Sequence, residues 1–281
     1  MKKLVFDTLS DIHLPSYLKI SAISGSYSKL IKSLYPKGHR AAKTFVLAGD
    51  LSEDIDQVIV FLKSLKTEKK YTTIIYVPGN HELYLTSLKW RSSKEKYNEI
   101  IRRVNELNPI GIYALDGTSI MVEGFKIGGA TGWYDGKYHL HCNPQIESDA
   151  AFRREVRASY KRIMLDSKYV PEDLFDMYEW QKEKLLNIGI DVDIVISHVS
   201  PLLDSKYLNE KWRDKEGSAF FSSNSGHIVR LLDPLLWIFG HAHDHLDEMY
   251  GDTRMLCNPY GYPYEKEGNK TLVQKITVEK R

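Results

Sequence analysis

Short apolar runs that each stop at a polar cluster constrain the fold of this chain more than any other feature. In the first eighty residues they are KLVFDTL (3–9), TFVLAG (44–49) and TTIIYVPG (72–79). Near-continuous apolar runs of this length are typical of strands buried on both faces of a sheet. Between the second and third runs, apolar residues recur at helical spacing from Ile55 to Leu65. Strand, helix and strand in this order predict a parallel crossover.

The pattern changes after residue 109. Residues 110–133 contain Asp-Gly and Glu-Gly pairs between short apolar segments. These pairs are typical of hairpin turns, so the segment predicts three strands of an antiparallel meander. Residues 145–188 predict two helices that are separated by Pro171.

Strand-like segments return in the second half of the chain. Residues 191–201 and 235–243 predict buried strands, and 271–280 alternates like an edge strand. We find no internal repeat and no flexible linker. The sequence therefore predicts a single domain over residues 1–281, with a helical insertion at about 140–190.

Composition favours an ordinary soluble globular protein, although it leaves room for a local basic groove. The chain of 281 residues is 42% hydrophobic and 27% charged, as an ordinary globular protein is. Its net charge of +2 gives no signal for a general nucleic-acid or membrane binder. No apolar run approaches the length of a membrane span. The apolar stretch near the N-terminus, which ends before Asp7, is too short for the core of a signal peptide. With only two cysteines, Cys142 and Cys257, a soluble cytoplasmic protein is predicted.

Polar residues of the types that can bind metals or protons follow the apolar runs. They are Asp11 and His13, Asp50, Asn80 and His81, His198, and finally His241 and His243. Ligands of open α/β sheets bind in the crevice beyond the carboxyl ends of the strands. These residues, distant in sequence, are therefore expected to meet there.

The four short motifs differ in how much each one tells. In a shuffled chain of this composition, Gly-Asp and Asp-x-His would each occur about once by chance. Gly-Asn-His and Gly-His-x-His would each occur in roughly one shuffled chain in fifty. The chance that all four motifs occur in this order at strand ends is on the order of one in a hundred thousand. The inference of a shared functional site therefore rests on the whole set of motifs.

The series Asp-x-His, Gly-Asp, Gly-Asn-His-Glu, a lone strand-end His and Gly-His-x-His resembles the calcineurin-like metallophosphoesterase superfamily. The resemblance covers residues 11–243, and GDTRMLCNPYGYP (251–263) is similar to a strand and turn of predicted bacterial and phage phosphoesterases. It implies an α/β fold of four layers, αββα, in which two mixed β-sheets pack together and helices flank them. It also implies a binuclear centre of two divalent metal ions.

The resemblance assigns a role to each matching residue. One ion would be held by Asp11, His13 and His243, the other by Asn80, His198 and His241, with Asp50 bridging both. His81 matches the catalytic histidine that is not a ligand. Glu53 and Glu82 resemble residues that orient the ligands.

Ligand chemistry agrees with these assignments. Oxygen and imidazole ligands without thiolate suit Mn, Fe, Zn, Ni or Co. Two ions about 3.5–4 Å apart lower the pKa of a bridging water and clamp phosphoryl oxygens. His241 and His243 alternate along the chain, so both would point the same way from an extended backbone and each would reach a different ion. His81 would protonate the leaving oxygen or stabilise the transition state, the alternative being a cap for the turn before a helix.

The predicted function is hydrolysis of phosphate mono- or diesters by a metal-activated hydroxide. A nuclease or a phosphodiesterase acting on a nucleotide substrate is one alternative, and a non-catalytic scaffold of the same fold is another. Protein phosphatases of the superfamily carry an aspartate where Glu53 stands and an arginine where Pro78 stands, which disfavours that class. The chain stops about forty residues after its last expected ligand, which disfavours a repair nuclease with a further C-terminal region.

Weaker signals leave alternatives open. His139 and His141 have ligand-like spacing, although a loop without metal is favoured, and His245 is expected at the surface. Trp133 and Tyr134 are expected either to contact substrate at the mouth of the site or to pack in the core.

A row of basic residues recurs at helical spacing on the predicted insertion. It consists of Arg153, Arg157 and Lys161. Such a row is either a solvated helix face or a basic lid that recognises the substrate phosphate.

Overall fold

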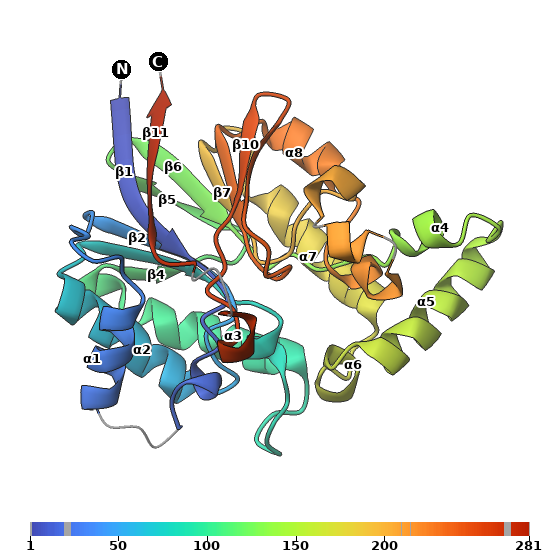
Figure 1. Cartoon of the computed structure of the whole chain (residues 1–281), viewed down its shortest axis with the longest axis horizontal. Coiled ribbons are helices and arrows are strands. Elements are labelled where there is room, and N and C mark those ends of the chain that lie inside the picture. The colour runs from blue at the N-terminus through green and yellow to red at the C-terminus, as the bar shows by residue number, and fades with distance from the viewer. Residues whose placement is uncertain (1, 20–23, 209, 214, 267–270, 281) are drawn as a thin grey trace.

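The computed structural model describes residues 2–19, 24–208, 210–213, 215–266 and 271–280, which form two β-sheets flanked by helices (Figure 1). The first sheet has the strand order β11-β1-β2-β3-β4. Its strands are β1 (Lys2–Leu9), β2 (Thr44–Ala48), β3 (Thr73–Val77), β4 (Ile112–Ala114) and β11 (Gln274–Lys280). Strands β1 to β4 run parallel, and β11 pairs antiparallel with β1.

The second sheet has the order β5-β6-β7-β8-β10-β9. Its strands are β5 (Thr118–Val122), β6 (Phe125–Gly129), β7 (Ile194–Ile196), β8 (Leu236–Phe239), β9 (Leu246–Tyr250) and β10 (Thr253–Cys257). The four inner strands β6, β7, β8 and β10 run parallel, and the edge strands β5 and β9 run antiparallel to their neighbours.

Eight α-helices are described. They are α1 (Ser24–Ser33), α2 (Ile55–Lys69), α3 (Ser93–Asn105), α4 (His139–Cys142), α5 (Asp149–Ile163), α6 (Asp166–Tyr169), α7 (Leu174–Asn187) and α8 (Gly226–Leu232). Of these, α1, α2 and α3 cover the outer face of the first sheet, and α7 and α8 cover that of the second. Short 3-10 helices lie at Leu14–Ser16, His81–Leu83, Asn108–Ile110, Ser205–Tyr207, Glu210–Trp212, Glu216–Phe220 and Pro263–Lys266. None of the described helices combines the length and apolar character needed to cross a bilayer.

The apolar runs are buried on both faces, as their composition predicts. On β2, Phe45 and Leu47 pack against the helices of the first sheet, whereas Val46 and Ala48 face the second sheet. Successive side chains of a strand point to opposite faces, so one run supplies two cores. On β8, Ile238 likewise faces the first sheet, and the neighbouring Trp237 and Phe239 pack toward α7 and α8.

Four layers follow from these cores. One apolar core lies between α1, α2, α3 and the first sheet, a second between the two sheets, and a third between the second sheet and α7 and α8. Figure 1 shows the helices α1 to α3 and the helices α7 and α8 on opposite sides of the paired sheets. The predicted αββα sandwich of two mixed sheets is therefore confirmed.

The predicted three-stranded meander over residues 110–133 is wrong in its first strand. β4 lies in the first sheet and pairs parallel with β3, and only β5 and β6 form an antiparallel hairpin, in the second sheet. Helix α3 connects β3 to β4, so β4 continues the parallel crossovers of the first sheet. The chain passes between the sheets at Leu115 and Gly117, whose amides donate to Tyr76 of β3 and Gly129 of β6.

Two helices occupy most of the segment where an insertion is predicted. They are α5 and α7, with Pro171 and the short α6 between them. The edge strand predicted at the end of the chain is β11. The single-domain organisation over 1–281, with its insertion, stays a prediction.

Removing a side chain from the core between the sheets tests this architecture. Phe6 is fully buried there, and Phe6→Ala is expected to lower the free energy of unfolding by about 3–5 kcal/mol, because it leaves a cavity. Val60 on α2 is 41% exposed, and the control Val60→Ala is expected to change stability by no more than about 0.5 kcal/mol. Denaturant unfolding would measure both, and equal losses would contradict the placement of Phe6.

Candidate metal centre

The polar residues that follow the strands meet at one end of the two sheets. Asp11 follows β1, Asp50 follows β2 and Asn80 follows β3, all in the first sheet. From the second sheet, His198 follows β7, and His241 and His243 follow β8. The two sets interlock, because the His241 amide donates to Asp11 Oδ1 at 2.9 Å. The convergence predicted from the strand ends is present.

Five of these residues adopt a backbone conformation that L-amino acids rarely use. They have positive φ: Asp11 53°, His13 46°, Asp50 55°, His241 68° and His243 52°. A non-glycine residue in this region costs of order 1–3 kcal/mol and persists only when the surroundings enforce it. Strain that clusters this way is typical of a functional site.

Glycines before the ligand candidates allow close approach. A Cβ on Gly79 would lie 2.0 Å from Asp50 Oδ1, and one on Gly240 would lie 2.5 Å from Asp11 Oδ2. Neither distance is compatible with a side chain, and neither glycine has a positive φ. The glycines of the Gly-Asn-His and Gly-His-x-His motifs are therefore needed because a carboxylate occupies the space beside them.

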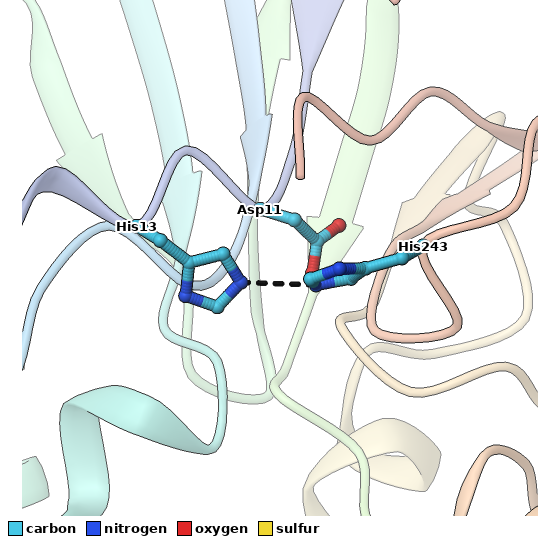
Figure 2. Close-up of side chains that lie close together, drawn as sticks. All are labelled: Asp11, His13 and His243. Atoms are coloured by element: carbon cyan, nitrogen blue, oxygen red, sulfur yellow. Dashed lines mark hydrogen bonds and ion pairs between the residues drawn. The ribbon is translucent and has the colours of Figure 1, made fainter. Parts of the chain in front are cut away.

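Figure 2 shows one group of three side chains, Asp11, His13 and His243, which point toward one another from two loops. His13 Nε2 lies 2.9 Å from His243 Nε2, and His243 Nε2 lies 3.4 Å from Asp11 Oδ1. One ligand atom from each of the three residues lies within 4.8 Å of the others. This spacing suits donors that share one cation.

A second group lies beside the first. It contains Asp50, His198 and His241, whose ligand atoms also lie within 4.8 Å of one another. His198 Nε2 is 3.3 Å from Asp50 Oδ1 and 2.9 Å from Asn80 Oδ1. Asp50 Oδ2 lies 3.7 Å from His13 Nε2 of the first group. Asp50 thus stands between the two groups, where a bridging carboxylate would be required.

Hydrogen bonds on the far side of three imidazoles leave a nitrogen of each for the centre. His198 Nδ1 lies 2.8 Å from the Ala48 carbonyl oxygen, and His241 Nε2 lies 2.7 Å from that of Phe220. His243 Nδ1 lies 2.8 Å from Glu265 Oε2. A carbonyl or carboxylate oxygen accepts, so each of these nitrogens carries the proton and the other ring nitrogen stays a donor of electrons.

The charges of the cluster stabilise one another. Burial alone would raise the pKa of Asp11, but the hydrogen bond and charge of His243 lower it to about 2. Burial would lower the pKa of His243, and the carboxylates of Asp11 and Glu265 raise it to about 10. Carboxylates that attract protons in this way also attract divalent cations, whose binding displaces those protons.

Comparison with known proteins identifies the family. The family model described as calcineurin-like phosphoesterase matches residues 5–245. The chain belongs to this family. A 24% identical relative, an uncharacterized protein of Acanthamoeba polyphaga mimivirus, aligns over 277 residues, 92% of this chain and 91% of the relative. The crystal structure of the phosphopantetheinyl hydrolase of Mycobacterium tuberculosis has the same fold, with a TM-score of 0.71, 17% identity and coverage of 97% of this chain and 95% of that one.

Around the calcineurin-like centre, Glu82 and Glu53 each make the kind of contact expected of residues that orient others. The buried Glu82 carboxylate accepts hydrogen bonds from the amides of Asp50, Leu51, Ser52 and Gly79. It thereby holds the loops after β2 and β3 together. Glu53 Oε1 lies 2.6 Å from His81 Nδ1.

His81 lies beside the two groups and is fixed on both sides of its ring. Its Nε2 is 3.9 Å from Asp50 Oδ2 and 3.2 Å from the Tyr262 hydroxyl. Burial would lower the pKa of His81, but the carboxylates of Asp50 and Glu53 raise it to about 9. A protonated imidazole in this position can donate a proton or a hydrogen bond toward the centre.

Three residues of the site were missed by sequence reasoning. Asp166 is buried at the start of α6, and its Oδ1 accepts a 2.7 Å hydrogen bond from Asn80 Nδ2. Tyr262 stacks on His13 with ring centroids 4.1 Å apart, and Glu265 holds His243. Tyr262 lies inside the turn after β10 that resembles the phosphoesterase turn, so that turn pointed to the right segment. No motif pointed to Asp166.

Trp133 and Tyr134 do not lie at the mouth of the site. They are 1% and 0% exposed, and neither lines the cavity over the centre. Tyr134 instead stacks on His241, with centroids 5.8 Å apart. The alternative of core packing describes them, because both rings are covered by the apolar cluster around α5 and α7.

The row of basic residues on α5 lies away from the centre. Arg153 pairs with Asp149 at 2.9 Å and Arg157 with Asp173 at 2.6 Å, and neither they nor Lys161 line the cavity over the centre. The solvated-face interpretation of this row therefore fits better than a basic lid.

The other histidines also lie outside the candidate centre. The pair His139 and His141 lies on the one-turn helix α4 rather than in a loop. His245 is exposed. Within the described residues, none of these three belongs to a group that could hold a metal ion.

Crowding at Gly240 gives a direct test of the centre. Gly240→Ala would press a methyl group against Asp11, so the variant is expected to bind Mn²⁺ about 10–100-fold more weakly. The matched control is Gly25→Ala on α1, where a Cβ meets nothing within 4 Å and Mn²⁺ affinity should not change. Titration calorimetry of chelator-treated protein would measure both affinities. Equal affinities for the two variants would contradict the close approach of Asp11.

Proposed function

We propose that this chain is a phosphoesterase that hydrolyses phosphate mono- or diesters with two divalent metal ions. The observation that carries the proposal is the convergence of seven ligand candidates from loops of both sheets in a chain of this family. Five of them line one cavity, and Asp11 and His198 are buried behind it. The complete ligand set favours an enzyme over a scaffold, because a scaffold has no need of these strained and buried residues.

The donor set fits a pair of divalent ions. Asp11 and Asp50 supply carboxylates, Asn80 supplies an amide oxygen, and the imidazoles come from His13, His198, His241 and His243. This mixture without thiolate suits Mn, Fe, Zn, Ni or Co. Asp11, His13 and His243 would hold one ion, Asn80, His198 and His241 the other, and Asp50 both. Such a pair lowers the pKa of a bound water and neutralises phosphoryl charge.

In this proposal His81 acts on the leaving group. Its Nδ1 is held by Glu53, so its Nε2 points toward Asp50 and the cavity. From there it donates a proton or a hydrogen bond to the ester oxygen as the bond to phosphorus breaks. Glu53 is then a positioning residue for His81, and Glu82 one for the loop that carries Asp50.

Two substitutions separate metal binding from proton transfer. Asp50→Ala is expected to remove metal and activity together, because Asp50 belongs to the second group and its Oδ2 lies 3.7 Å from His13 Nε2 of the first. His81→Ala is expected to keep its metal and to lose about 10²–10⁴-fold in turnover. Metal analysis and hydrolysis of p-nitrophenyl phosphate and its bis-ester, over a panel of divalent ions, would measure both effects.

The two variants are controls for each other. Full turnover by His81→Ala on both esters would refute its proposed role while leaving the metal centre intact. Normal metal content in Asp50→Ala would refute the centre itself. A wild-type protein that binds no metal and hydrolyses neither ester under any ion of the panel would favour the scaffold.

Asp166 is proposed to position Asn80. By accepting from Nδ2 it turns Oδ1 of the amide toward His198 and the centre. Asp166→Ala is expected to weaken Mn²⁺ binding by about 10-fold, and Asp166→Asn, which keeps an acceptor oxygen, to restore most of it. Calorimetry and thermal melting would be run on both. If both variants melt alike and lose equal affinity, the hydrogen bond is not what positions Asn80.

A further inference from the structure

We infer that the cavity over the metal centre selects phosphate esters of uncharged, flat, apolar alcohols and rejects esters whose alcohol carries a second anionic group. The inference rests on the proposed phosphoesterase function and deepens it by naming a substrate class. It follows from what forms the walls of the cavity, as distinct from its floor.

The walls above the ligand candidates are apolar. The cavity has a volume of about 230 Å³ and reaches from the histidines to Met164, Leu165, Trp212 and Phe221. This volume is below the roughly 300–1,000 Å³ that encloses a drug-sized ligand. With a phosphoryl group on the floor, the space that remains suits an alcohol of about the size of one ring. The apolar side chains would then contact that ring.

Several wall rings are fixed by neighbouring rings. Trp212 and Phe221 pack edge to face with centroids 5.3 Å apart. Tyr262 lies between His13, at 4.1 Å and 21°, and Tyr264, at 5.3 Å and 9°. Rings held in place lose little freedom when a ligand binds, so their contacts contribute to affinity at small entropic cost. The wall is therefore suited to a rigid flat group.

The described residues supply carboxylates but no lysine or arginine to these walls. The carboxylates are those of Asp166 and Glu265. Lys211, next to Trp212, is not a lining residue, and its ammonium lies 3.5 Å from Asp244. Among the described lining residues, it is the imidazoles of the floor, together with the proposed cations, that compensate negative charge.

A second anionic group on the substrate would therefore meet an unfavourable environment. It would lose water beside Trp212 and Phe221 and approach the carboxylates of Asp166 and Glu265 without a partner. Polyphosphates and carboxylated esters are disfavoured for this reason. An uncharged aromatic alcohol instead replaces water at apolar surfaces.

Binding of phosphonates, which are not hydrolysed, tests the inference apart from catalysis. Calorimetry on Mn²⁺-loaded protein would compare methylphosphonate, phenylphosphonate and 4-carboxyphenylphosphonate. Phenylphosphonate is expected to bind at least about tenfold more tightly than methylphosphonate, because its ring contacts the wall. The carboxylated compound is expected to bind at least about tenfold more weakly than phenylphosphonate.

A pair of tryptophan variants locates the effect. Trp212→Ala is expected to reduce the advantage of phenylphosphonate over methylphosphonate to about threefold or less. Trp180→Ala is the matched control, because Trp180 packs against Tyr97 and does not line the cavity. It should retain the full advantage, and a thermal melt of each variant would verify that it is folded.

The outcomes separate this inference from the proposed function. Methylphosphonate binding without a phenyl advantage would overturn the apolar wall while leaving the phosphoesterase proposal standing. Equal or tighter binding of the carboxylated compound would overturn the rejection of a second anion. Failure of all three to bind would count against phosphoryl binding at this centre, and both proposals would fall together.

Discussion

Polar donors packed against one another at the junction of the two sheets are the constraint on which the rest of the structure depends. Asp11 is fully buried and Asp50 nearly so, and His13 and His243 face each other with nitrogens 2.9 Å apart. Burying such groups together is costly unless positive charge lies among them. The arrangement is therefore stable as the lining of a cation site, and the surrounding fold holds it in place.

The means of holding it is the parallel arrangement of strands in both sheets. Parallel strands place their carboxyl ends at the same end of a sheet. The loops that follow β1, β2 and β3 therefore meet the loops that follow β7 and β8. Backbone hydrogen bonds then join the loops, with the His13 amide donating to Asp50 and the Gly240 amide to His198. These contacts compensate for the strained backbone at Asp11, His13, Asp50 and the two histidines after β8.

Periodic and local signals made much of this predictable from sequence. Two-sided burial of the strands followed from the unbroken apolar runs, and the ligand candidates followed from their positions after those runs. The three residues that were missed act at long range. Asp166 pairs with Asn80 across 86 residues, and Tyr262 reaches His81 across 181. No spacing rule connects residues that far apart, because tertiary packing alone brings them together.

Sequence reasoning was wrong where a local pattern competed with topology. Turn residues around β4 resemble those of a hairpin, yet the crossover through α3 places this strand in the other sheet. Trp133 and Tyr134 illustrate the same limit. The sequence left open whether they line the mouth of the site or pack in the core, and in the structure the apolar cluster around α5 and α7 covers them. Which side of an element is exposed depends on the segments that pack over it. The sequence of the element itself does not contain this information.

The chain from the end of α5 to the start of α6 contacts the ligand candidate Asn80 and lines the cavity wall above the centre. Met164 and Leu165, in the turn between α5 and α6, line the cavity wall, and the next residue, Asp166 at the start of α6, accepts the hydrogen bond from Asn80. One short stretch therefore acts on both a proposed metal ligand and the proposed alcohol subsite. A change in this turn that alters the wall would also move Asp166. If both proposals hold, substrate selection and the geometry of the centre are coupled through a segment that contributes none of the proposed ligands, and a substitution there would change both substrate preference and metal affinity.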